Sequence, residues 1–129
     1  MVPPLQPLDI AQTRTTPRVV FAQETRTLIM QGESYPENSF QFFGRILAWT
    51  EDYLTRADGI TLSVDIPYMN SSSTKCMLDL LDRLADAHVR GIPVRVVWTY
   101  DPKNPRALDL AKDFEEEVTL PFDIVPSRG

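Results

Sequence analysis

The chain has 129 residues, a formal net charge of −5 and 43% hydrophobic residues. This length and composition fit one globular domain with a hydrophobic core of its own. The charge argues against a nucleic-acid backbone as the main partner, because no stripe of Lys and Arg is available to displace counterions. No apolar run approaches the ~20 residues of a membrane span.

Cysteine usage and the first residues favour a reducing compartment. The single cysteine, Cys76, excludes an internal disulfide, and its place in an amphipathic run predicts a small buried hydrophobic residue rather than a reactive thiol. The N-terminus lacks the basic and then apolar pattern of a signal peptide. We therefore expect a cytoplasmic protein with no membrane partner, whose default partner is another protein.

The first third of the chain predicts an arm and then a hairpin. Residues 1–17 carry four of the eleven prolines and no apolar period, so we expect a flexible N-terminal arm ahead of a single domain over residues 18–129. Short apolar runs at 18–23 and 27–31 flank a polar turn and predict two antiparallel strands.

A helix is predicted next, capped by Asn38 or Ser39 and running to about residue 56. It has a wide apolar face with many aromatic residues, and we expect most of that face, including Phe40, to be core. Aromatic residues at the margin of the face are candidates for contact with a partner protein.

The second half of the chain alternates strands and helices. The expected elements are a strand at 60–66, a helix at about 72–90 ended by Gly91, a strand at 92–100, a helix after the turn at 101–105, and a strand at 121–125. The whole order is then ββαβαβαβ. Strand–helix alternation in units this short requires right-handed crossovers, so the fold class is α/β with a mixed, partly parallel sheet packed with helices.

The turn between the strand at 60–66 and the helix after it carries the most distinctive chemistry. Asn70, Ser71, Ser72, Ser73 and Thr74 are consecutive, and one or two of these side chains suffice to accept the free N–H groups of a first helical turn. The surplus of hydroxyls lies at the positive end of a helix dipole, where a phosphate group is well tolerated. The residues alone leave capping, phosphate binding and phosphorylation open.

Other candidate sites are weaker. His88 is the only histidine and falls near a helix C-terminus, where a structural role complements the dipole. The acidic run at 115–117 is typical of a solvated helix end. No P-loop, dinucleotide fingerprint, Ser-His-Asp set or metal-ligand spacing is present, so we predict no catalytic residue, no cofactor and no metal.

The element order and the serine-rich turn resemble the STAS domain of anti-sigma factor antagonists, in which the turn reads Asp-Ser-Ser-Gly. Three segments together resemble more specifically the SiaC-type regulatory phosphoproteins, over nearly the whole chain after the arm. They are Gly32-Glu33-Ser34-Tyr35-Pro36-Glu37-Asn38-Ser39, Tyr68-Met69-Asn70-Ser71-Ser72-Ser73-Thr74-Lys75 and Trp98-Thr99-Tyr100-Asp101.

This resemblance implies a non-enzymatic bacterial switch protein with a STAS-like fold. Members are phosphorylated by a dedicated serine/threonine protein kinase and dephosphorylated by a PP2C-type phosphatase. In the unmodified form they bind and activate a diguanylate cyclase, in the control of c-di-GMP and biofilm formation. The resemblance places the phosphorylated residue at Ser71, with Ser72 and Ser73 as alternatives, because the better-known members have a threonine there.

The residues expected to contact the partner border the modified one. They are Pro67, Tyr68, Met69, Asn70, Ser72 and Lys75. A dianion among them has to be desolvated on binding, so the unphosphorylated form is expected to bind. Two alternatives stay open: a protein or enzyme that binds a phosphorylated metabolite at the same helix end, and a constitutive scaffold that is never modified.

Overall fold

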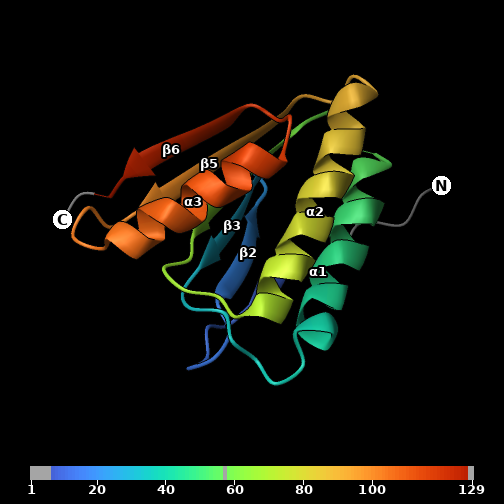
Figure 1. Cartoon of the computed structure of the whole chain (residues 1–129). Helices are drawn as coiled ribbons and strands as arrows, with labels where there is room; N and C mark the ends of the chain where they lie inside the picture. Colours follow the sequence, from blue (N-terminus) through green and yellow to red (C-terminus); the bar gives the residue numbers. More distant parts are fainter. Residues whose placement is uncertain (1–6, 57, 128–129) are drawn as a thin grey trace.

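The computed structural model describes residues 7–56 and 58–127. In this part of the chain the sheet has the strand order β1-β2-β3-β4-β5-β6, so each strand pairs with its neighbour in the sequence. The strands are β1 (Asp9–Ile10), β2 (Arg18–Ala22), β3 (Thr27–Gln31), β4 (Ile60–Asp65), β5 (Val94–Tyr100) and β6 (Phe122–Pro126), and the helices are α1 (Ser39–Leu54), α2 (Ser71–Val89) and α3 (Pro105–Glu117) (Figure 1).

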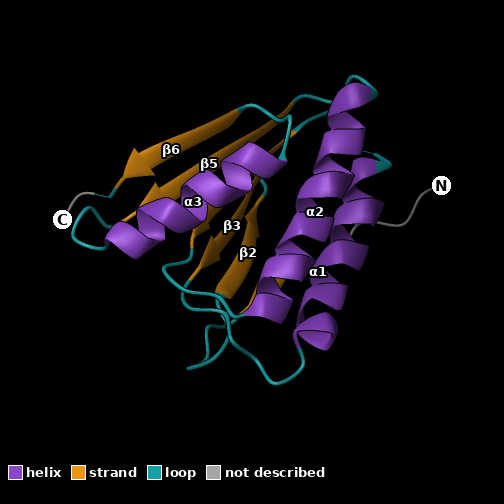
Figure 2. Cartoon of the chain, viewed as in Figure 1, coloured by secondary structure: helices purple, strands orange, loops and turns teal. Residues whose placement is uncertain are grey.

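The sheet is mixed, as predicted. β1, β2 and β3 are antiparallel, whereas β3 to β6 run parallel. Right-handed crossovers that always step toward the same edge place their helices on the same side of a sheet. Accordingly α1, α2 and α3 all cover one face (Figure 2). The α/β class and the partly parallel sheet are confirmed.

The core lies between that face and the helices. Along β4, Leu62 and Val64 are fully buried while Thr61 and Ser63 are only half-buried, which is the alternation that a sheet covered on one side requires. Under α3, Trp98 of β5 is fully buried and stacks on Phe114 of that helix, with ring centroids 4.9 Å apart.

An asparagine caps the N-terminus of each helix in the described residues. Asn38, Asn70 and Asn104 use their side-chain oxygens to accept the backbone N–H of Gln41, Ser73 and Ala107, respectively. These bonds satisfy donors that have no partner within the helix. Of the two predicted caps of α1, Asn38 and Ser39, the cap is Asn38, and α2 begins at Ser71, one residue earlier than expected.

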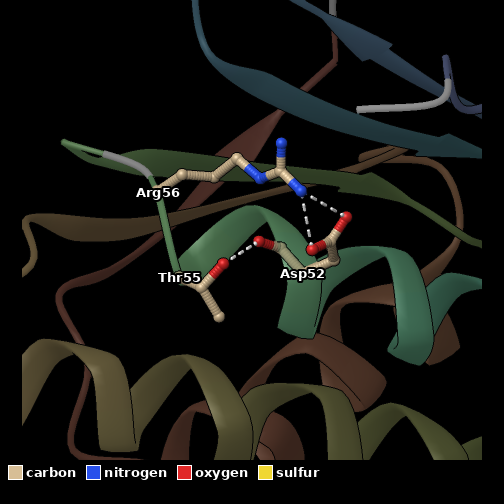
Figure 3. A network of polar contacts seen from close by, with 3 residues as sticks. All are labelled: Asp52, Thr55 and Arg56. Carbon is tan, nitrogen blue, oxygen red and sulfur yellow. Dashed lines mark hydrogen bonds and ion pairs between the residues drawn. The ribbon is translucent and has the colours of Figure 1, made fainter. Parts of the chain in front are cut away.

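The C-terminal end of α1 is fixed by a small polar network (Figure 3). The Thr55 hydroxyl donates to the backbone oxygen of Asp52 at 2.7 Å, and Arg56 donates to both carboxylate oxygens of Asp52 at 3.0 and 3.2 Å. The backbone N–H groups of Thr55 and Arg56 bond to the carbonyls of Asp52 and Tyr53, three residues back instead of four, so the α-helix ends at Leu54, two residues before the predicted end.

Two features of the fold differ from the prediction. The predicted flexible arm covers residues 1–17, but β1 in this segment pairs with β2 and Leu8 is 3% exposed, so residues 8–10 are part of the folded domain. Residues 1–6 of the arm lie outside the described residues. Phe40 is 59% exposed, so it does not belong to the core. Cys76 and Gly91 are as predicted: Cys76 is buried, and Gly91 follows α2 with a φ of 100°.

None of the helices in the described residues combines the length and the apolar character that crossing a membrane requires.

Candidate functional site

The serine-rich turn lies where β4 leaves the sheet, beside the start of α1. A parallel bridge between Ser34 and Met69 extends the pairing of β3 with β4 beyond the sheet. The Ser34 N–H donates to the Tyr68 carbonyl, and the Asn70 N–H donates to the Ser34 carbonyl, both at 2.9 Å. The start of α2 is therefore held against the start of α1, and Figure 1 shows the two helix ends side by side.

Asn70 has a structural task in this arrangement. Its side-chain oxygen accepts the Ser73 N–H at 2.9 Å, and its backbone oxygen accepts both the N–H and the hydroxyl of Thr74, at 2.9 and 3.1 Å. Asn70 supplies the side-chain cap of α2, so none of the three serines is needed for capping.

Four serine side chains meet behind the turn, and we call Ser34, Ser39, Ser72 and Ser73 the hydroxyl cluster. The Ser39 oxygen lies 2.7 Å from that of Ser72 and 3.1 Å from that of Ser73, and the Ser34 oxygen lies 2.9 Å from that of Ser73. Ser34, Ser39 and Ser73 are at most 1% exposed, and Ser72 is half-buried. Because a buried hydroxyl without a partner is costly, these bonds hold the two helix ends together.

Ser71 is placed differently from its two neighbours. It is the first residue of α2 and is exposed, and within residues 7–56 and 58–127 its hydroxyl has no hydrogen-bond partner. Of the three serines, Ser73 is enclosed, Ser72 is tied to Ser39, and Ser71 is accessible. The three candidates for phosphorylation therefore differ in how readily each hydroxyl can react.

The residues expected to contact a partner are only partly gathered at the surface. Tyr68 is 52% exposed and Lys75 is exposed, whereas Pro67 is half-buried. Met69 is 7% exposed and packs in the core, so its side chain offers little to a partner. The Tyr68 ring also meets Tyr35 edge-on, with centroids 6.1 Å apart.

Phe40 is a further exposed aromatic residue at this end of the molecule. It follows Ser39, whose hydroxyl touches Ser72, so it lies in the first turn of α1 beside the start of α2. The helical period assigned Phe40 to the apolar face of α1, but Phe40 lies at the edge of the buried stripe: Ser39 and Phe43 beside it are buried, whereas Gly44, one turn later, is exposed. The sequence therefore did not indicate that Phe40 is exposed and available to a partner.

The local charge is low. The first turn of α2 contains no acidic residue, and Lys75, one helical turn after Ser71, is the one cation in the stretch from Ile66 to Cys76. Asp65 ends β4, and partial burial, with a smaller contribution from Asp101, raises the pKa of its carboxyl group.

The opposite end of the sheet carries a hollow of about 520 Å³ that includes His88 at the end of α2. Its two arginines are both in ion pairs: Arg26 with Asp58 at 3.3 Å, and Arg95 with Asp123 at 2.8 Å. Among the described residues no cluster of His, Cys, Asp or Glu is suited to hold a metal ion.

A family model described as SiaC family regulatory phosphoprotein matches residues 10–127. The chain belongs to the SiaC family. An uncharacterized protein of Pseudomonas aeruginosa strain UCBPP-PA14 is 42% identical over 120 residues, which cover 91% of this chain and 94% of the relative.

Two solved SiaC structures share the fold. The crystal structure of apo-SiaC from Pseudomonas aeruginosa has a TM-score of 0.87 and 39% identity, covering 93% of this chain and 98% of that one. SiaC in the crystal structure of the diguanylate cyclase SiaD in complex with its activator SiaC, also from Pseudomonas aeruginosa, has a TM-score of 0.88 and 40% identity, covering 93% and 99%. The resemblance to the SiaC family seen in the sequence is thus confirmed.

Substitutions in the serine-rich turn should separate the structural hydroxyls from the accessible one. Ser73→Ala removes the hydroxyl that pairs with the buried Ser34 side chain and should lower the free energy of unfolding by about 1–2 kcal/mol. Ser71→Ala should lower it by less than about 1 kcal/mol, because Asn70 provides the cap. Urea unfolding of both variants measures the difference, and equal losses would contradict this assignment.

The raised pKa of Asp65 makes a prediction about pH. A carboxyl group whose pKa is higher in the folded than in the unfolded state destabilises the fold when it is ionised, and this penalty disappears as the pH falls through the folded pKa. Asp65→Asn should therefore be more stable than the wild type at about pH 7, and the difference should shrink toward about pH 4. Urea midpoints across this range measure it; a difference that grows at low pH would show the opposite sign.

Proposed function

We propose that this SiaC family chain is a reversible phosphoprotein switch in which Ser71 receives the phosphate and the unphosphorylated form binds an effector protein. In this role the protein has no catalytic activity of its own and acts in the cytoplasm. It is supported by the family and by the state of one side chain, Ser71.

The observation that carries the proposal is the contrast between Ser71 and its neighbours. A protein kinase needs an accessible hydroxyl that it can bring in line with the γ-phosphate of ATP. Ser71 is exposed and unbonded among the described residues, while Ser73 is fully buried and Ser72 is bonded to Ser39. This favours Ser71 as the acceptor over the two alternatives.

Phosphorylation at this position suits a switch that leaves the fold intact. The phosphate adds about −1.5 to −2 charges at neutral pH, and the positive end of the α2 dipole tolerates them. No acidic side chain in the first turn of α2 opposes the new charge. The modification therefore changes the surface and not the structure beneath it.

The surface around Ser71 supports binding by the unmodified form. Tyr68 and Phe40 present exposed aromatic rings at the same end of the molecule, and Ser71 adds a neutral hydroxyl. Exposed aromatic residues are typical anchors of protein interfaces. A phosphate among them has to lose its water on binding, and the protein already carries a net charge of −5.

The proposed partners follow the family. The effector is a diguanylate cyclase, by analogy with the SiaD–SiaC complex, and its regulation connects the switch to c-di-GMP and biofilm control. A dedicated serine/threonine kinase adds the phosphate and a PP2C-type phosphatase removes it. Phosphometabolite binding at the same helix end is less well supported, because Lys75 is the one cation in the turn and a phosphate clamp needs several donors.

Phosphorylation is tested first. The wild-type chain, incubated with its kinase and ATP, should gain one phosphate by intact-mass spectrometry, and Ser71→Ala should gain none. The substitution removes the accessible hydroxyl and leaves the other two held. A wild-type chain that stays unmodified would favour the constitutive scaffold, and a phosphorylated Ser71→Ala chain would exclude Ser71 as the sole acceptor.

The direction of the switch is tested by binding. Ser71→Asp should weaken the complex with the isolated cyclase by about 1–3 kcal/mol in titration calorimetry, as a lower bound on the effect of phosphate. Ser71→Asn is the matched control, because it has nearly the shape of aspartate without its charge, and it should bind within about 0.5 kcal/mol of the wild type. Tighter binding by the phosphorylated chain than by Ser71→Ala would reverse the proposed direction.

A further inference from the structure

Ser39 connects the first turn of α1 to the serine-rich start of α2. It is the first residue of α1 and 1% exposed, and its oxygen lies 2.7 Å from that of Ser72 and 3.1 Å from that of Ser73. Asn38 caps α1, so Ser39 is not needed to begin its own helix. Its contacts instead reach across 33 residues of sequence to Ser72 of α2.

The Ser72 hydroxyl would otherwise resemble that of Ser71. Ser72 is only half-buried and is the next residue of the same exposed helix end. Its oxygen is engaged twice, by Ser39 at 2.7 Å and by the Asn70 side-chain oxygen at 3.3 Å. To attack a phosphate, this hydroxyl has to leave both contacts and turn outward, whereas the Ser71 hydroxyl has none to leave among the described residues.

We propose that Ser39 is a specificity-determining positioning residue that withholds the Ser72 hydroxyl from phosphoryl transfer and so directs the phosphate to Ser71. This inference rests on the proposed function. In the transfer, the serine oxygen forms a bond to the γ-phosphorus of ATP, the bond from that phosphorus to the β–γ bridging oxygen breaks, ADP leaves, and the hydroxyl proton passes to the kinase's base. Ser39 takes no part in these steps and acts only on which hydroxyl is presented.

The test combines two substitutions. In a Ser71→Ala background, Ser39→Ala removes the hydroxyl that holds Ser72. The kinase and ATP should then phosphorylate Ser72 at least about tenfold more than in Ser71→Ala alone, the factor expected from one lost hydroxyl–hydroxyl bond. Peptide mass spectrometry should place the new phosphate on Ser72 and not on Ser73, because Ser34 still bonds Ser73.

Thr50→Val is the matched control in the same Ser71→Ala background. Thr50 is also a fully buried hydroxyl of α1, bonded to the Ile46 carbonyl at 2.8 Å, but it lies eleven residues farther along the helix. Its loss should not expose Ser72. Ser39→Cys keeps a slightly larger side chain in the site with a weaker donor and should act in the same direction as Ser39→Ala, so the test does not depend on one variant folding well.

The outcomes separate this inference from the proposed function. If the wild type is phosphorylated on Ser71 and neither Ser39 variant gains phosphate on Ser72, the inference is overturned and the switch stands. The same holds if Thr50→Val gains as much as Ser39→Ala, since general loosening then explains the change. A wild-type chain that accepts no phosphate overturns the proposed function and the inference with it.

Discussion

The bridge between Ser34 and Met69 is the constraint on which the serine-rich end of the molecule depends. β3 and β4 run parallel and both leave the sheet at the same end, where backbone hydrogen bonds to Ser34 continue their pairing. The chain passes into α1 and α2 from these two segments. Because the bridge fixes where both helices start, their first turns lie close enough for their serine side chains to bond directly.

The hydroxyl cluster then divides one serine-rich turn into two parts with different tasks. Ser73 and Ser72 face the junction and stabilise it, while Ser71 faces water. A phosphate added to an accessible hydroxyl changes the charge of the surface without disturbing a junction to which that hydroxyl does not bond. Adjacent residues therefore have different tasks: Ser72 and Ser73 stabilise the junction, and in the proposed switch Ser71 carries the change of charge.

The sequence predicted the elements well because their signals are local. Asn38 lies directly before an amphipathic run and Gly91 directly after one, and both act as expected. The roles of Ser34 and Ser39 could not be predicted from the residues, since their partners lie 33 to 39 positions away and nothing near either serine indicates a buried contact. Phe40 was misplaced for a related reason: the helical period gives the direction of a side chain but not whether anything covers it.

Strand order in this sheet has a consequence for how the protein forms. Among the described residues each strand from β2 onward pairs with the strand that precedes it in the chain, so no strand has to be inserted between two others. During synthesis the sheet can be extended at one edge as each strand emerges. All partners of the hydroxyl cluster have been made once residue 73 is complete, so the serine-rich junction can begin to assemble before β5, α3 and β6 exist.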